Sequence, residues 1–314
     1  MTARLERSGD DDRELRSVDR GVFVGLTALD FGYLVQRYPV EDTKNTAEDQ
    51  FTAAGGPATN AAVTFAFLAR GGTHLMTALG AHFLTEFVRD DLRQHAVQVT
   101  DLTPERAEPP PISSITIARE NGSRTVVSLD ASRLVVPASA LPDGLLHDVG
   151  VVLLDGHLPE LCVAVARAAR EAGVPVVFDG GRWKKINDVL LEYVDIAICS
   201  RSFHPPAAVD HGRHAVHEYL HARGVDLVAT TDGAAPIRFS TPTAQGEVAV
   251  PQTAAIDTLG AGDIFHGAFC YYFLRSNGRF REALENAALV ASTSCAHFGT
   301  RAWMAANGRA RFPG

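Results

Sequence analysis

Short apolar runs alternate with longer amphipathic segments along most of the chain. Residues 22–26 and 151–154 are apolar throughout, which is typical of strands that are buried on both faces of a parallel sheet. Residues 57–70 and 159–172 repeat their apolar positions at helical spacing, and each segment is followed by glycine, which is common at helix ends. The alternation predicts an α/β domain built on a parallel sheet.

The remaining segments of the chain can be assigned from the same kinds of pattern. Charged residues dominate residues 1–17, which we expect to form a disordered tail before a single domain at 18–314. A turn is expected at 245–247, where glycine lies between polar residues. The remaining strands are expected at 74–79, 174–178, 193–199 and 225–229, and the remaining helices at 263–276 and 281–295.

A second, smaller sheet is predicted from segments that interrupt this alternation. Residues 110–130 contain an alternating strand, a strong hairpin signal at Asn121-Gly122 and a returning strand. An isolated hairpin is marginally stable, so these strands should join others, which residues 33–53 can supply. The two segments would form a lid that is inserted in the main domain rather than following it.

Composition narrows the classes of function. A chain of 314 residues, 46% of them hydrophobic, suffices for one large domain, and a net charge of −8 without a Lys or Arg block argues against nucleic acid as a partner. No apolar run reaches the roughly 18 residues that a membrane-spanning helix needs. Four cysteines lie far apart, which predicts reduced, buried thiols and a cytoplasmic location. They are Cys162, Cys199, Cys270 and Cys295.

Candidate chemistry concentrates at residues 257–263, DTLGAGD, directly before a helical pattern. Small residues let a ligand approach the backbone, and the first amides of a helix lack internal partners, so Gly260, Ala261 and Gly262 are suited to bind phosphate. Asp263 can accept a proton from a hydroxyl that attacks phosphorus, which indicates phosphoryl transfer to an alcohol. A glycine-rich turn with Asp263 as a helix cap is the simpler alternative.

A second stretch, AGGPATNAA at 54–62, favours the catalytic interpretation. Together the two stretches resemble the paired signatures of the ribokinase-like (PfkB) carbohydrate kinases, and the resemblance runs from about residue 22 to about residue 303. It implies a three-layer α/β/α sandwich with a small β-sheet lid, and transfer of the ATP γ-phosphate to a sugar with Mg²⁺ present. The run DGGRWK at 179–184 is similar to the ketohexokinase and sulfofructose-kinase side of the family.

The resemblance also implies that Asp30, Gly56 and Asn60 contact the sugar, with Gly55 beside them. Asp30 follows the first expected strand, where a carboxylate can accept hydrogen bonds from two hydroxyls, although Asp is also a common turn residue. Asn60 can donate and accept toward a hydroxyl, or be a partly buried helix residue. Polar residues of the lid strand either contact substrate or simply occupy a strand edge: Ser113, Ser114 and Thr116.

Nucleotide-binding positions of the family are matched in part. Thr231 and Gly233 match a Thr-x-Gly beside the nucleotide, and Ala287 and Val290 fall where relatives pack adenine. Ser200 stands where many relatives have Asn-x-x-Glu, which organises Mg²⁺ and phosphate. Because that carboxylate is missing here, Mg²⁺ must be held mainly through ATP and water, or by another acid.

Further positions leave alternatives open. Asp257 resembles a residue that shapes the phosphate loop and, in several relatives, a monovalent-cation site, so K⁺ is a candidate ligand. Residues 81–86, AHFLTE, depart from the family pattern of an Asp and a later Gly, which leaves some substrate contacts open. Three basic residues after Asp179 suit ATP phosphates, a charged substrate or a solvated loop: Arg182, Lys184 and Lys185.

Four histidines recur at roughly helical spacing, which suits a metal site or, since no acid or Cys completes a set, a solvated helix face: His211, His214, His217 and His221. The lid often makes the dimer contact in the family, so a homodimer through the lid is expected. A nucleoside kinase of the same fold would favour an aromatic-rich lid, which this chain does not have. A ligand-binding pseudokinase would explain the missing Asn-x-x-Glu but not the intact loop with Asp263.

Overall fold

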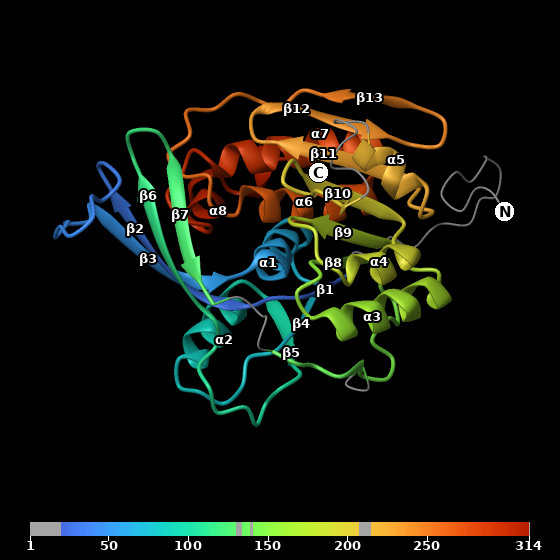
Figure 1. Cartoon of the computed structure of the whole chain (residues 1–314), viewed down its shortest axis with the longest axis horizontal. Helices are drawn as coiled ribbons and strands as arrows, with labels where there is room; N and C mark the ends of the chain where they lie inside the picture. The colour runs from blue at the N-terminus through green and yellow to red at the C-terminus, as the bar shows by residue number, and fades with distance from the viewer. Residues whose placement is uncertain (1–19, 130–133, 139–140, 207–214, 314) are drawn as a thin grey trace.

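The structure, a computed structural model, describes residues 20–129, 134–138, 141–206 and 215–313, so the tail expected at 1–17 lies outside it. Within these residues the chain forms a large sheet of nine strands and a small sheet of four (Figure 1). The order of the large sheet is β13 (Gln245–Val248), β12 (Ala235–Ser240), β11 (Leu227–Asp232), β10 (Ile196–Ser200), β9 (Val176–Gly180), β8 (Val151–Leu154), β1 (Gly21–Val24), β4 (Thr73–Thr77) and β5 (Val97–Asp101). The pairings from β11 to β5 are parallel, whereas β12 pairs antiparallel with both of its neighbours.

Helices cover both faces of the large sheet, because successive residues of each strand point to opposite sides. Phe23 of β1 joins one apolar core, while its neighbours Val22 and Val24 join the other. The first core packs under α1 (Pro57–Ala69), α2 (Thr85–Gln94), α6 (Ala261–Arg275), α7 (Phe280–Ser294) and α8 (Ala302–Asn307), and the second under α3 (Pro159–Ala172), α4 (Asn187–Leu190) and α5 (Ala215–His221). Two short 3₁₀ turns also occur, η3 (Leu191–Tyr193) and η5 (Arg309–Arg311). The expected three-layer α/β/α sandwich is confirmed.

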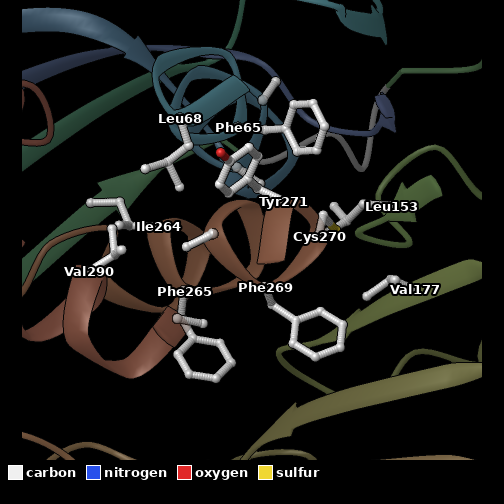
Figure 2. Close-up of a cluster of buried hydrophobic side chains, with 14 of the residues drawn as sticks. Phe65, Leu68, Leu153, Val177, Ile264, Phe265, Phe269, Cys270, Tyr271 and Val290 are labelled. Carbon is white, nitrogen blue, oxygen red and sulfur yellow. The ribbon is translucent and has the colours of Figure 1, made fainter. Parts of the chain in front are cut away.

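Helix α6 lies at the centre of the first core and is apolar on several sides (Figure 2). Tyr271 faces Phe65 of α1, with 6.2 Å between the ring centroids, and Phe269 points to the opposite side of the helix. The backbones of α1 and α6 also approach closely, since a Cβ on Gly267 would lie 2.2 Å from the carbonyl oxygen of Ala61. The two helices are therefore close enough for side chains at their N-terminal ends to meet.

The small sheet stands to one side of the large one and forms the expected lid (Figure 1). Its strand order is β3 (Asp49–Gly55), β2 (Ala28–Val35), β6 (Ile112–Ala118) and β7 (Ser123–Ser128). Leu34, Ile115 and Ile117 are buried on its inner face and pack against Phe51 and Leu259. The lid begins earlier than the predicted residue 33, because β2 follows β1 after three residues.

One expected turn is wrong. Residues 245–247 begin β13 and pair with β12, while the reversal lies just before them, where the Thr241 N–H donates to the Ala244 carbonyl at 2.7 Å. Gly246 faces the ring of Phe239, whose nearest atom would be 3.0 Å from a Cβ, so this glycine provides room for packing rather than a turn.

Three expected segments coincide with observed elements: 112–118, 151–154 and 159–172.

The contact between α1 and α6 predicts the effect of enlarging Gly267. We expect Gly267→Ala to lower the free energy of unfolding by about 1–3 kcal/mol, because backbone atoms of α1 must move to admit the methyl group. Urea unfolding measures this change. The control is Gly181→Ala, where a Cβ meets nothing within 4 Å. Equal stability of the two variants would contradict the close packing.

Candidate active site

Asp257 holds the loop that leads into α6. One carboxylate oxygen accepts the Leu259 N–H at 2.8 Å, and the other accepts the Gly299 N–H at 2.9 Å. Burial raises the pKa of Asp257, and these two hydrogen bonds limit the rise. Gly260 then adopts a φ of 68°, and a Cβ there would lie 2.9 Å from the Thr300 side chain, so the position requires glycine.

The first amides of α6 differ in their partners. The helix begins where the Ile264 N–H donates to the Gly260 carbonyl at 2.8 Å. The Ala261 N–H already donates to the Thr258 carbonyl at 3.3 Å, which contradicts its expected place in the anion site. Among the described residues, nothing accepts the N–H groups of Gly260 and Gly262, and these two remain the candidate anion donors.

Asp263 lies in the first turn of α6, beside Asn60 in the first turn of α1. The Asn60 amide nitrogen donates to Asp263 Oδ2 at 2.9 Å. Helix α1 starts abruptly because Gly56 has a φ of 104° and Pro57 takes the first helical position. A Cβ on Gly56 would lie 2.3 Å from the Leu26 carbonyl oxygen, so this glycine brings α1 against the end of β1. The structure thus joins the two stretches that the sequence singled out.

Asp30 lies on lid strand β2 rather than in a turn, and it is 5% exposed. Its carboxylate covers Gly55, where a Cβ would lie 1.9 Å from Oδ2, so glycine provides the space that the carboxylate occupies. Burial raises the pKa of Asp30 to about 6, while a hydrogen bond from Ser113 and the charge of Arg301 limit the rise. Asp30 and Gly55 therefore remain candidates for holding hydroxyl groups.

The lid strand β6 divides its polar residues between two faces. Ser113 is buried and in register with Asp30, on the inner face. Ser114 and Thr116 alternate with Ser113, Ile115 and Ile117, so they point to the outer face. The expectation that Ser114 and Thr116 bind substrate is therefore wrong, and Ser113 is the polar residue of β6 beside Asp30.

Arg301, at the start of α8, connects Asn60 to the lid and to α2. Its guanidinium donates to Asn60 Oδ1 at 3.0 Å, to the Ala54 carbonyl at 2.6 Å and to Asp91 Oδ2 at 3.1 Å. Asp91 Oδ2 also accepts the Ala54 N–H at 3.0 Å. Although burial opposes ionisation of Asp91, the hydrogen bond from His95 and the charge of Arg301 lower its pKa.

Asp179 and His266 are charged or titratable neighbours of Asp263. Asp179, on β9, has its Oδ2 3.6 Å from His266 Nδ1. Both ring nitrogens of His266 face carbonyl oxygens, with Nδ1 2.7 Å from Gly262 and Nε2 3.1 Å from Ile198. A carbonyl oxygen only accepts, so both contacts are hydrogen bonds only when the imidazole is doubly protonated. Such an imidazolium would offset part of the negative charge around Asp263.

These neighbours set the proton affinity of Asp263. Burial raises its pKa to about 7 and repulsion from Asp179 adds to the rise, whereas the hydrogen bond from Asn60 and the charges of His266 and Arg124 oppose it. A carboxyl group that titrates near neutral pH can both accept and release a proton at physiological pH. Asp263 thus has the chemistry of a general base.

The β6–β7 hairpin of the lid contacts the loop before α6. Arg124 of β7 donates to the Thr258 hydroxyl at 2.7 Å, and that hydroxyl lies 3.4 Å from the Gly122 carbonyl oxygen. The lid therefore reaches over the loop and brings a positive charge close to the candidate anion donors.

A cavity of about 160 Å³ lies beside α7. The expectation that Ala287 and Val290 contact adenine is wrong, because both are fully buried in the core, where Figure 2 shows Val290 near Ile264 of α6. Their neighbours around the helix line the cavity instead. The lining residues include Pro251, Gln252, Leu289, Ser292, Thr293 and Arg311.

The other expected nucleotide positions lie at the ends of neighbouring strands. Ser200 ends β10 and is in register with Thr231 of β11, and its hydroxyl donates to a backbone carbonyl at 2.9 Å. Gly233, with a φ of 56°, forms the turn into β12. Gln252 donates to the Ala234 carbonyl at 3.3 Å, which links this turn to the cavity.

Lys184, left open by the sequence, has a partner within the protein. It donates to the backbone carbonyl of Asp155 at 3.0 Å, at the end of β8. The Asp155 carboxylate in turn accepts the N–H groups of Leu26 at 2.9 Å and Ala58 at 3.2 Å. Asp155 therefore ties β8 to β1 and to the start of α1, and Lys184 supports that junction.

Two of the four histidines with helical spacing, His211 and His214, lie outside the described residues. His217 and His221 do not face solvent freely, because each has a ring nitrogen 2.7 Å from the hydroxyl of Ser240 on β12. Nowhere in the described part of the chain do three His, Cys, Asp or Glu side chains come together to hold a metal ion. His217 and His221 therefore connect α5 to the sheet.

Residues 19–306 match the pfkB family carbohydrate kinases, so the chain belongs to this family and is a carbohydrate kinase. Ribokinase of Arabidopsis thaliana is 27% identical over 86% of this chain and 74% of its own length. Ketohexokinase of Mus musculus is 24% identical over 87% of this chain and 94% of its own.

Solved structures agree on the fold. Ribokinase from Giardia lamblia superposes with a TM-score of 0.76 at 17% identity, over 90% of this chain and 95% of that one. Fructokinase from Xylella fastidiosa with bound ATP gives a TM-score of 0.68 at 20% identity, over 90% of this chain and 94% of that one. Of the helices that the structure describes, none has the length and apolar character needed to cross a membrane.

Several side chains around Asp263 were not among the site residues predicted from the sequence. His266 follows Asp263 by three residues, so helical spacing places both on one side of α6, and this signal was available. Asp91 and Arg301 have no spacing that links them to Asn60 or to each other, and only the fold brings them together.

The raised pKa of Asp263 predicts how activity depends on pH. An ionised carboxylate accepts the proton, so kcat/KM should be constant well above pH 7 and should fall as the pH drops below about 7. A pH–rate profile at saturating ATP measures this. Titration of ¹³C-labelled carboxyl groups in the ligand-free protein separates Asp263 from the ionisation of ATP. A profile that stays flat down to pH 5 would contradict the assignment.

Proposed function

We propose that this protein transfers the γ-phosphate of ATP to a hydroxyl group of a sugar, with Asp263 as the general base. The observation that carries the proposal is the position of Asp263 in the first turn of α6. There a carboxylate with a pKa of about 7 lies next to two N–H groups that, among the described residues, have no acceptor. This combination suits an attacking alcohol and a phosphate that meet at one helix end.

The proposed step needs little covalent chemistry from the protein. The sugar hydroxyl gives its proton to Asp263 as its oxygen bonds to the γ-phosphorus, and the bond from that phosphorus to the bridging oxygen breaks to release ADP. The N–H groups of Gly260 and Gly262 stabilise negative charge on the transferring group. Asp30, Gly55, Gly56 and Asn60 would orient the sugar, and the lid would exclude water.

The cavity beside α7 is the candidate site for the adenine of ATP. The cavity of about 160 Å³ beside α7 offers apolar contact from Leu289 and polar groups from Gln252 and Thr293. Ser200, Thr231 and Gly233 stay candidates for phosphate or ribose contact, and Gln252 of the cavity donates to the carbonyl of Ala234, next to Gly233. The cavity thus supports an adenine position next to Leu289, one residue before the buried Val290.

Magnesium would enter with the nucleotide. The described residues bring no three acidic or imidazole ligands together as a cage for the ion, and Mg²⁺ readily keeps several waters when it is bound by phosphates. Bound there, it would neutralise charge on the β- and γ-phosphates. A K⁺ site beside Asp257 stays a prediction. Both carboxylate oxygens of Asp257 already accept backbone N–H groups.

The lid also supports the expected homodimer. Strand β7 is exposed along its whole length, and Val126 and Val127 are 46% and 69% exposed. An exposed edge strand with apolar side chains is a natural place for a second copy to pair. Such pairing would join the two lids edge to edge through β7.

A substrate panel and one substitution test the proposed function. The names of the relatives direct the panel to pentoses, ketohexoses and phosphorylated sugars, with nucleosides as the alternative class. With the preferred acceptor, Asp263→Asn should lower kcat by about 10²–10⁴-fold, because the amide cannot take the proton, while ATP affinity by calorimetry stays within about twofold. The control is Asp188→Asn on α4. Near-normal turnover of the Asp263 variant would remove it from this role.

The cavity gives a separate prediction for the nucleotide. Leu289→Trp should fill it and raise the KM for ATP by about tenfold, equivalent to about 1.4 kcal/mol of binding, while the KM for the sugar changes little. The matched control is Glu285→Trp, one turn earlier on α7 and outside the cavity. If both variants bind ATP normally, adenine lies elsewhere.

A further inference from the structure

Arg301 is a largely buried cation with an unusual set of partners. Its side chain is 15% exposed, and its guanidinium reaches side chains from α1 and α2 as well as the backbone of β3. One terminal nitrogen contacts Asn60 Oδ1, and the other contacts the Ala54 carbonyl and Asp91 Oδ2. Three separate elements that border the active site therefore converge on one side chain from the C-terminal region.

The chemistry of the guanidinium determines which way the Asn60 amide faces. Arginine has only donors, so Asn60 must present its oxygen to Arg301. The amide nitrogen then points the other way, and it lies 2.9 Å from Asp263 Oδ2. Without a donor at Oδ1, rotation by 180° would let the amide oxygen accept a hydrogen bond from a protonated Asp263 carboxyl, which would favour the neutral form of Asp263. Arg301 thus selects the orientation in which Asn60 donates to Asp263.

This orientation has two effects on Asp263. A hydrogen bond to one carboxylate oxygen favours the ionised form, which is the form that accepts a proton. It also occupies Oδ2 and fixes the carboxyl plane, and within the described residues no group donates to the other oxygen. That second oxygen is left for the hydroxyl of a substrate.

The remaining contacts keep Arg301 itself in place. Asp91 balances its charge and also accepts the Ala54 N–H, so the guanidinium, the carboxylate and the peptide of Ala54 close a ring of hydrogen bonds. Ala54 precedes Gly55, whose lack of a side chain makes room for Asp30. The charged or titratable groups that face Asp263 or Arg301 from neighbouring elements are Asp179 (β9), His266 (α6), Arg124 (β7), Asp91 (α2) and Asp30 (β2).

We propose that Arg301 is a positioning residue of the kinase reaction, which acts through Asn60 to keep Asp263 ionised and correctly oriented. The inference rests on the proposed function for its effect on turnover. Its structural part, the control of Asp263 through Asn60, holds in the ligand-free protein and can be tested there.

The decisive measurement is the titration of the Asp263 carboxyl by ¹³C NMR in ligand-free protein. Arg301→Met should raise its pKa by about one unit or more, which is the effect of losing a hydrogen bond to a charged group. Arg281→Met, which removes an exposed ion pair with Glu285 on α7, is the matched control and should leave the titration unchanged.

A double variant separates action through Asn60 from any direct effect of charge or folding. In an Asn60→Leu background the amide is gone, so adding Arg301→Met should produce no further shift in the titration of Asp263. A further shift of the same size as in the single variant would show that Arg301 acts independently of Asn60, and this would overturn the inference.

Kinetics provide the second readout. Arg301→Met should lower kcat by about tenfold to a hundredfold, leave the KM for ATP unchanged and move the acidic limb of the pH profile upward. If Arg301→Met does not fold, Arg301→Lys retains the charge next to Asp91 but cannot reach all three acceptors, and a smaller upward shift of the Asp263 pKa is expected.

The outcomes distinguish this inference from the proposed function. A wild-type protein that phosphorylates no member of the panel would refute the proposed function, while the titration would still decide the role of Arg301. An active wild-type protein whose Asp263 titrates identically in the folded Arg301→Met or Arg301→Lys variant would refute the inference alone.

Discussion

The meeting of two helix N-termini is the constraint on which the rest of this structure depends. Helices α1 and α6 come from distant parts of the sequence, and they approach because Gly267 lets the backbones touch at Ala61. At their first turns this contact places Asn60 within hydrogen-bonding distance of Asp263. The apolar side chains along the two helices, such as Phe65 and Tyr271, supply the burial that holds the polar ends together.

Around that meeting point the fold gathers an unusual number of buried carboxylates. Asp155 and Asp257 accept backbone N–H groups with both of their oxygens, and these bonds fix the strand ends and the loop. Asp30 and Asp263 have fewer donors, and burial raises their pKa values to about 6 and about 7. Carboxylates of one chemical type therefore serve both as acceptors that fix the backbone and, at Asp30 and Asp263, as groups that can exchange protons near neutral pH.

Much of the fold could be predicted from the sequence, because buried strands and amphipathic helices differ in period. Residues 112–118, 151–154 and 159–172 have strong patterns and clear ends. The predicted turn at Gly246 was wrong, because this glycine makes room for the ring of Phe239 within a strand. The prediction also failed for Ser114 and for Val290, which have the expected position in sequence but face the wrong side of their elements. The direction in which a side chain points depends on how its element packs, and a sequence motif does not specify that direction.

The long-range part of the site was beyond prediction for the same reason. Asp263 and the 54–62 stretch are local signals that could be found from residue types alone. Arg301 and Asp91 are 210 positions apart, and their ion pair exists only because α2 and α8 pack on the same side of the large sheet. Nothing in either local sequence distinguishes these residues from surface charges.

The path of the chain between the lid and the large sheet has a mechanical consequence. Strand β3 runs directly into α1 through Gly56, and β2 leaves β1 after three residues, so two of the connections between the lid and the body of the molecule are very short. A swing of the lid would require backbone rotation at these few positions. Such a swing would pull on the first turn of α1, and substrate entry would thereby disturb the same turn that later orients the reacting groups.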